Sequence, residues 1–228
     1  DVDGVYTADP RIVPNARKME EVTYDEMLEM ASLGAKVLHS RCVEIAKKYG
    51  VELLVCSSLN RNSGTMVREK TKMEKMLISG VAADKNVAKI RVAGLGNDPE
   101  STFRLLNLLD RNNLNIDVMI QSLGKDGTKS VSFTVAKPDM LRTIDVLNDN
   151  KDSLGIKKLD YDENVAKISV IGAGVRSHSG VAAKMFGALA NAGINTEMIT
   201  TSEIRITALI DEAYADQAMR AIHETFLE

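Results

Sequence analysis

The sequence has 228 residues, which is enough for about two domains of ordinary size. Hydrophobic residues make up 44% of it and charged residues 27%, as expected for a globular protein with a sizeable core. The net charge of −3 offers no electrostatic footprint for nucleic acid or an anionic membrane, and no apolar run reaches the roughly 18 residues of a transmembrane helix. We therefore predict neither nucleic acid nor a membrane as a partner.

The two cysteines, Cys42 and Cys56, show neither a CxxC motif nor metal-ligand spacing. This pattern predicts two small buried residues, no metal site and a reducing environment. The sequence has no signal peptide and opens on a turn motif without an initiator methionine. We therefore expect a fragment of a longer cytoplasmic protein.

In chain order, the first feature is a dense turn signal, DVDGVYTADPR, at residues 1–11. Turns of this kind can present backbone amides to phosphate groups, and Tyr6 and Arg11 lie within the motif. An ordinary surface loop is the alternative interpretation.

Two helices are predicted next. Thr23 and Glu26 fit a capping box, and the helix that follows should bury Met27, Met30 and Ala31. After Gly34, a second helix should run to Gly50 with an apolar face made of Val37, Leu38, Cys42, Ile45 and Ala46.

A strand, a turn and a connection complete this first region. The run VELLVCSSL, residues 51–59, is typical of a strand buried on both faces of a mainly parallel sheet. Residues 60–65 should form a turn. Residues 66–75 are highly charged, and we expect them to connect this region to the next.

Most of the remaining sequence is duplicated. VAKIRV begins at Val87, and VAKISV begins 78 residues later at Val165. Past the glycine turn, matching pairs lie 80 residues apart: Leu105/Met185, Leu106/Phe186, Leu109/Leu189, Asn115/Asn195 and Asp117/Glu197. The second copy therefore carries two extra residues in its turn, and both copies should share one fold.

Each copy shows the order strand, helix, strand, strand, helix, which is five-sixths of the ferredoxin-like βαββαβ unit. The later strands are predicted at 116–122 and 130–135 in copy one and at 196–202 and 204–210 in copy two. The first helices should bury Phe103, Leu106 and Leu109, or Val181, Met185 and Leu189. The last helices should bury Met140, Ile144 and Leu147, or Ala218, Ile222 and Phe226.

The sixth strand differs between the copies. Residues 156–161 supply it in copy one, but in copy two the sequence stops directly after the last helix. A sheet without this strand would leave an unpaired edge. We predict that residues 76–83 cross over and complete the sheet of copy two. The predicted fold class is α+β, with tandem ferredoxin-like domains, one inserted in the other, preceded by an α/β segment.

The sequence resembles a known family along essentially its whole length. The run DVDGVYTADPRIVPNARKMEEVTYDEMLEMASLGAKVLHSR resembles the end of the kinase domain of bacterial aspartokinase. The duplicated region, with GAGVRSHSG, NIDVMIQS and NTEMITTSEIRI, resembles the tandem ACT regulatory domains of that family. The resemblance implies a C-terminal portion of an amino-acid kinase domain (1–65), a connection (66–75), ACT domain 1 (84–163) and ACT domain 2 (76–83 plus 164–228).

The resemblance implies ATP-dependent phosphorylation of the aspartate side-chain carboxylate, with magnesium expected alongside ATP and no prosthetic group. The family's nucleotide contacts map onto Asp1, Tyr6, Arg11, Lys36 and Val37. Cations and oriented amides suit a reaction that spreads negative charge over a phosphoryl group. The family's remaining catalytic motifs would precede Asp1, so we expect no catalytic residue in this chain and no activity from it alone. Without the resemblance, a solvated Lys36 and a packed Tyr6 would be the simpler interpretation.

As the resemblance implies, ACT domains bind small amino acids between paired units, so lysine, threonine or both are expected as effectors and a homodimer through the ACT region is expected. An amino acid needs amide donors for its carboxylate and an acidic acceptor for its ammonium. In copy one the matching positions are Asn97, Asp98, Pro99, Asn115, Ile116, Asp117 and Gln121. In copy two they are Ser177, His178, Ser179, Gly180, Val181, Asn195, Glu197, Thr201 and Ser202.

Several of these positions also have a purely structural interpretation. Pro99 could simply start a helix, and His178 could be a turn residue. Asn115 and Asn195 could be loop asparagines before a strand. Asp117 and Glu197 could be strand charges that face solvent. Glu100 stands where the family often has glycine, and its charge would repel an effector carboxylate in copy one.

A separate, non-catalytic ACT regulatory subunit is the alternative to an aspartokinase fragment. Residues 1–65 disfavour it, because a regulatory subunit does not need kinase sequence. A different amino-acid kinase with a similar tail is disfavoured by the tandem ACT pair. If the chain is an aspartokinase fragment, we expect effector binding to shift residues 66–75 and thereby to move the loop at residues 1–11.

Overall fold

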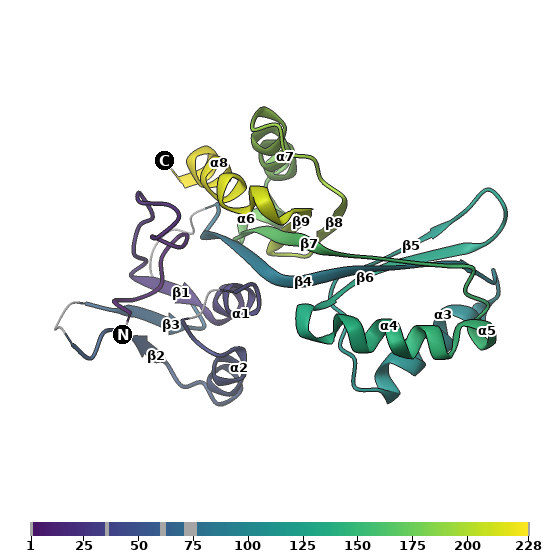
Figure 1. Ribbon diagram of the computed structural model, residues 1–228. Coiled ribbons are helices and arrows are strands. Elements are labelled where there is room, and N and C mark those ends of the chain that lie inside the picture. Colours follow the sequence, from purple (N-terminus) through teal and green to yellow (C-terminus); the bar gives the residue numbers. More distant parts are fainter. Residues whose placement is uncertain (1, 35–36, 60–62, 71–76, 228) are drawn as a thin grey trace. The chain divides into compact units, whose positions relative to one another are not determined.

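Figure 1 shows the computed structural model of the protein, which describes all residues except 1, 35–36, 60–62, 71–76 and 228. The chain divides into two compact units. The split unit comprises Asp1–Lys85 and Lys167–Glu228, and the inserted unit comprises Asn86–Ala166. Within the described residues, no helix combines the length and the apolar character needed to cross a membrane.

The inserted unit has the predicted order βαββαβ. Its elements are the second part of β4 (Gly80–Leu95), α3 (Pro99–Arg111), β5 (Met119–Leu123), β6 (Lys129–Ala136), η1 (Lys137–Asp139), α4 (Met140–Asp149), α5 (Lys151–Leu154) and the first part of β7 (Lys158–Ile171). The strands lie in the order β5-β6-β4-β7. The helices cover one face of this sheet (Figure 1) and bury Phe133, Leu105 and Leu147 against it.

The second copy repeats this arrangement, and after the resemblance given above we call it the ACT part of the split unit. It contains the end of β7, α6 (Gly174–Ser177), α7 (Val181–Asn191), β8 (Met198–Thr201), β9 (Arg205–Asp211), η2 (Glu212–Tyr214) and α8 (Ala215–Leu227). Its strands lie in the order β4-β7-β9-β8, so the start of β4 occupies the place of the missing sixth strand. Ser79 N donates to Ile171 O at 2.7 Å, and Gly174 N donates to Leu77 O at 2.9 Å. The predicted crossover is therefore confirmed.

One detail of the strand prediction was wrong. Four separate strands were expected around residues 76–92 and 156–170, but the structure contains two long strands, β4 and β7, each of which serves both copies. The physical reason lies in residues 84–86 and 162–164, which contain neither glycine nor proline and so do not break the extended backbone.

The kinase-like part of the split unit is a small sheet with two helices. It contains β1 (Glu21–Thr23), α1 (Tyr24–Ser32), α2 (Ser40–Tyr49), β2 (Leu53–Val55) and β3 (Thr65–Arg68). β1 pairs parallel to β3, and β2 pairs antiparallel to it. The predicted capping box of α1 is present, since Thr23 Oγ1 accepts from Glu26 N and Glu26 Oε2 accepts from Thr23 N. Met27 and Met30 are buried as predicted.

Several predictions in this region were wrong. The strand at 51–59 is reduced to β2, an edge strand of a mixed sheet, and Leu54 is 59% exposed. The second helix begins only at Ser40, and Ile45 points outward with 51% of its surface exposed. Residues 66–68 belong to β3 and are not part of a connection. Both cysteines are exposed.

The errors about burial in β2 and α2 have a common cause. An apolar run predicts burial only when the rest of its domain covers it, and the partners of β2 and α2 among the described residues cover one side alone. A separate error concerns α3, where Leu105 and Leu109 face the core and Phe103 is 65% exposed. The apolar stripe there runs through Ser101, Leu105 and Leu109, at spacings of four residues.

Candidate functional site

The described part of the predicted nucleotide loop, residues 2–11, belongs to a longer segment that folds back on itself, residues 2–19, which we call the N-terminal loop. Thr7 N donates to Arg17 O at 2.9 Å, and Met19 N donates to Val5 O at 2.8 Å. The fully buried Thr65 on β3 anchors this loop, because its Oγ1 accepts from Val5 N at 2.8 Å and donates to Met19 O at 2.6 Å. Gly4 fits close to this anchor, since a Cβ at that position would lie 2.7 Å from Thr65 Oγ1.

The loop carries an exposed cation at Arg11, whose orientation is set by its neighbour Asp9. Arg11 Nε and Nη2 donate to the two carboxylate oxygens of Asp9, at 3.0 and 2.6 Å. The side-chain hydrogen bonds from Arg11 hold the pKa of the Asp9 carboxyl below its ordinary value, and Asp9 in turn raises the pKa of Arg11. Because 83% of the Arg11 side chain stays exposed, Asp9 orients the guanidinium without removing it from solvent.

The other predicted nucleotide residues are placed as follows. Tyr6 lies on the same loop and is half-buried. Its backbone forms an isolated antiparallel β-bridge with that of Lys18. Val37 packs against the buried cluster that contains Val5. Asp1 and Lys36 lie outside the described residues. The structure therefore places Tyr6 and Arg11 on one loop and links Val37 to the base of that loop.

In copy one, the start of α3 is closed by its own carboxylate. Asp98 Oδ1 accepts from Glu100 N at 2.9 Å and from Ser101 N at 2.8 Å, and Asp98 Oδ2 accepts from the Ser101 hydroxyl. The hydrogen bond from the Ser101 side chain, followed by those from the two backbone amides, lowers the pKa of Asp98. The amides that an effector carboxylate would need are thus occupied by a residue of the helix itself.

The remaining copy-one residues lie near the same helix end or on the loop before β5. Gln121 Oε1 accepts from the Thr102 hydroxyl at 2.6 Å, which brings β5 against the first turn of α3. Asp117 N donates to Thr134 O of β6 at 3.0 Å, which holds the loop before β5 against the sheet. Asn97, Pro99 and Asn115 are exposed, and Ile116 is half-buried.

In copy two, the corresponding helix end is open. Gly180 is the N-cap of α7, has a φ of 101°, and makes no side-chain capping bond. Ser177 Oγ and His178 Nδ1 lie 2.8 Å apart in the turn before it, and Ser179 is exposed. Val181 is buried in the core. The first amides of α7 therefore have no capping side chain, in contrast to those of α3.

The other predicted copy-two residues lie on or next to strand β8 or at the C-terminal end of α7. Glu197 N donates to Leu209 O at 2.8 Å, and Ser202 N donates to Arg205 O at 2.7 Å. Thr201 pairs with Ile206 in the β8–β9 ladder. Asn195 lines a hollow of about 430 Å³ at the C-terminal end of α7, together with Phe186, Leu189, Ala190, Gly193, Ile194 and Thr196.

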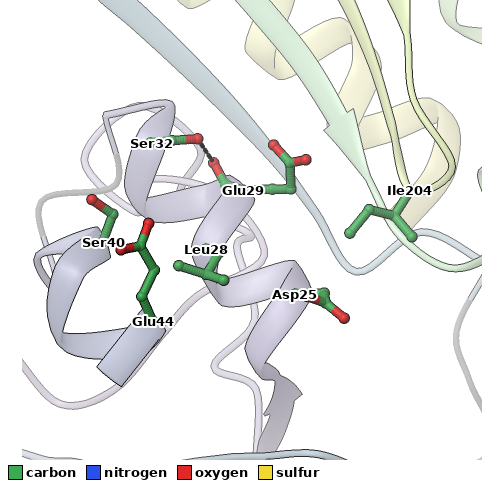
Figure 2. A pocket seen from close by; sticks show the side chains of 7 residues that line it. All are labelled: Asp25, Leu28, Glu29, Ser32, Ser40, Glu44 and Ile204. Atoms are coloured by element: carbon green, nitrogen blue, oxygen red, sulfur yellow. Dashed lines mark hydrogen bonds between the residues drawn. The ribbon is translucent and has the colours of Figure 1, made fainter. Parts of the chain in front are cut away.

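A second hollow, of about 360 Å³, was not predicted from the sequence. Figure 2 shows its lining residues, which are Asp25, Leu28, Glu29, Ser32, Ser40, Glu44 and Ile204. Two of its carboxylates are paired: Asp25 with Lys47 at 2.5 Å, and Glu29 with Arg205 at 2.8 Å. The Ser32 hydroxyl donates to Glu29 O at 2.9 Å. Its carboxylates come from α1 and α2, and no motif in the sequence signals their convergence.

Comparison with family models assigns both parts of the chain. Residues 1–57 match the model of the amino acid kinase family, and residues 168–226 match an ACT domain model. The two matches fall on the kinase-like part and on the ACT part of the split unit.

Comparison with individual proteins gives full coverage of this chain. An aspartokinase from Pseudomonas aeruginosa is 43% identical over 229 residues, which cover 99% of this chain and 56% of that protein. The crystal structure of E. coli aspartokinase III with aspartate and ADP, in the R-state, matches 100% of this chain and 51% of that chain, with a TM-score of 0.88 and 27% identity. The T-state structure with lysine and aspartate gives a TM-score of 0.81 at 28% identity, with the same coverage. The chain thus spans about half the length of these relatives.

Proposed function

We infer the function from one premise: this chain belongs to the aspartokinase family and matches the C-terminal part of its members. The observation that carries this inference is the match over 99% of the chain, with kinase sequence first and ACT sequence after it. We propose that the parent activity is transfer of the ATP γ-phosphoryl group to the side-chain carboxylate of L-aspartate, in the cytoplasm. Magnesium would enter with the nucleotide, as MgATP.

The N-terminal loop is proposed to serve the nucleotide in this reaction. Phosphoryl transfer is catalysed mainly by positioning and by neutralising negative charge on the phosphoryl oxygens. Arg11 supplies an exposed cation whose orientation is set by Asp9, and Tyr6 belongs to the same loop. Neither residue is proposed to act as a base or a nucleophile.

The chain by itself is expected to phosphorylate no aspartate. The matched relatives are almost twice its length, and an apolar surface on α2 and β2 is left open, with Tyr49 71% and Leu54 59% exposed. Such a surface is typical of the interior of a larger α/β domain. An assay that couples ADP release to NADH oxidation should show no turnover with this chain alone. Turnover should appear when the N-terminal half of the Pseudomonas aeruginosa relative is added, and appreciable activity of the chain alone would contradict the proposal.

The ACT region is proposed to bind lysine, threonine or both as feedback effectors. The solved T-state relative contains lysine, which favours lysine as the first ligand to test. Of the two copies, copy two offers the better site for an amino-acid carboxylate, because the amides of α7 are uncapped and those of α3 are held by Asp98.

A matched pair of variants tests this preference. Gly180→Asp places a self-capping carboxylate where copy one has Asp98, whereas Gly180→Ala adds the same backbone strain without a charge. Both Cβ atoms meet open space. The thermal unfolding midpoint, Tm, of the unaltered chain should rise by roughly 5–10 °C at an effector concentration about 100 times Kd.

The two variants should then separate. We expect Gly180→Ala to keep the effector-induced shift and Gly180→Asp to need at least about tenfold more effector for it, since a second carboxylate must be displaced. Leucine serves as the ligand control. No shift of the unaltered chain with either lysine or threonine would count against an effector role, and equal responses of the two variants would move the site away from α7.

A homodimer through the ACT region is also proposed. β5 is the edge strand of the inserted unit, and its Met119, Ile120 and Leu123 are 39%, 36% and 62% exposed. An apolar edge strand of this kind pairs readily with a second copy. Sedimentation velocity of the chain measures this directly, and a monomer at high micromolar concentration would argue against it.

A further inference from the structure

A buried polar contact joins the N-terminal loop to the last helix of the ACT region. Thr7 Oγ1 and His223 Nε2 lie 2.9 Å apart, although 216 residues separate them in the sequence. The exposed fraction is 3% for Thr7 and 0% for His223. A hydrogen bond so far from solvent is costly to break, because its partners would lose it without gaining water.

Thr7 is also the point at which three segments of the split unit meet. Its N donates to Arg17 O at 2.9 Å, and its Oγ1 accepts from Arg17 N at 3.0 Å, so Thr7 closes the loop on itself. Its carbonyl oxygen accepts from Val81 N at 2.8 Å, which ties the loop to the start of β4. His223 adds the third segment, helix α8.

The apolar contacts of the loop follow the same pattern. Ala8, directly after Thr7, and Val13, further along the loop, are buried in the ACT core cluster that contains Met219 and Ile222 of α8. By contrast, Val5, directly before Tyr6, belongs to the cluster of the kinase-like part. The loop therefore crosses from one hydrophobic core to the other at Tyr6 and Thr7, and the contact with His223 lies at that crossing.

We propose that His223 is a positioning residue that sets the conformation of the N-terminal loop through Thr7, so that any displacement of α8 is transmitted directly to the segment carrying Tyr6 and Arg11. In this route a single hydrogen bond connects the ACT helix and the loop. An effect of this link on nucleotide binding rests on the nucleotide role proposed above for Tyr6 and Arg11. The mechanical link itself does not.

Hydrogen exchange measured by mass spectrometry on the full chain tests the link. His223→Leu removes the polar atom, whereas His223→Gln keeps an amide group near the position of Nε2. We expect His223→Leu to speed exchange of the loop amides at residues 7–17 by about tenfold or more, and His223→Gln to restore most of the protection. Glu224→Gln, an exposed change on the same helix, should leave the loop unchanged.

A second pair approaches the same bond from the loop. Thr7→Val removes the hydroxyl at nearly constant volume, and with it both the contact with His223 and the hydrogen bond from Arg17 N, whereas Thr7→Ser keeps the hydroxyl. The comparison of His223→Leu with His223→Gln therefore isolates the contact with α8, and the Thr7 pair tests whether the hydroxyl holds the loop. Thr7→Val should reproduce the faster exchange, and Thr7→Ser should not. Amides of β6 in the inserted unit provide the internal reference.

Two results would overturn the link. One is a loop that exchanges at the normal rate in both Thr7→Val and His223→Leu. The other is a His223→Gln variant as unprotected as His223→Leu, which would reduce His223 to a packing residue. Because the experiment contains no nucleotide and no effector, its failure is separate from a failure of the proposed kinase role, which the complementation assay addresses.

Discussion

Replacing Lys167 by methionine is expected to lower the free energy of unfolding by about 3 kcal/mol, which is the lower end of the range for breaking a buried ion pair. Lys167 Nζ lies 3.2 Å from Asp84 Oδ2, and its side chain is 5% exposed. Removing Lys167 leaves the Asp84 carboxylate largely buried beside an apolar group. The lower end applies because Asp84 retains 16% of its side-chain exposure, so water screens part of its charge.

Lys158→Met is the matched control for this change. Lys158 lies on the same strand, β7, and pairs with Asp160 at 2.8 Å, but the two side chains are 68% and 39% exposed. Exposed pairs contribute about 0–1 kcal/mol, so this variant should unfold at nearly the normal urea concentration. The double variant Lys167→Met with Asp84→Leu should recover much of the loss, because it removes both members of this ion pair. Urea unfolding followed by circular dichroism measures all of these, and equal effects of the two lysine changes would refute the argument.

Gly172→Ala is expected to destabilise the crossover that completes the ACT sheet of the split unit, by about 1–3 kcal/mol or more. A Cβ at Gly172 would lie 2.7 Å from Ile78 Cα, 2.8 Å from Leu77 O and 2.8 Å from Ser79 N. These are backbone atoms of the crossing segment and cannot rotate away. The neighbouring bonds from Ser79 N to Ile171 O and from Gly174 N to Leu77 O would have to lengthen.

Gly187→Ala is the control, because a Cβ there meets no atom within 4 Å and the residue lies inside helix α7. This variant should be unchanged or more stable, by up to about 1 kcal/mol, since alanine is the better helix former. Thermal unfolding of the two variants side by side decides the matter. A Gly172→Ala protein as stable as the unaltered chain would mean that residues 77–79 do not pack against β7 as described.

Much of the architecture was predictable because it depends on local patterns and on repetition. The repeat of VAKIRV as VAKISV predicted two copies of one fold, and the missing last strand of copy two predicted a crossover. Thr23 and Glu26 predicted a capping box that the structure contains. In each case, residues close in sequence, or a second copy of them, supplied enough information.

The residues of the candidate site were predictable from the sequence, but their hydrogen-bond partners were not. Both Asp98 and Gly180 were candidate residues from the sequence, yet only the structure shows that they are the N-caps of α3 and α7 and that Asp98 occupies the amides of its own helix. The contact of Thr7 with His223 joins two positions that no spacing rule connects. The outward positions of Phe103 and Ile45 were missed for a related reason, because a helix can carry apolar residues outside the stripe that meets the core.

The two VAKI strands separate what the sequence determined from what tertiary structure decided. Alternation alone determined one buried face in each copy: Ile90 and Val92 in β4, Ile168 and Val170 in β7, all fully buried. The opposite face was not determined by the strand. Arg91 of copy one is exposed, whereas its counterpart Ser169 is completely buried and lies 2.7 Å from Thr207.

The difference arises because the kinase-like part of the split unit packs on the second face of the copy-two sheet, where Ile171 joins the cluster of Tyr24, Met27 and Met30. A strand's own period of two specifies which residues share a face, but burial of that face depends on a distant segment folding against it. For this reason the equivalent lysines of the two VAKI sequences differ. Lys89 is half-exposed, whereas Lys167 is buried and forms an ion pair with Asp84.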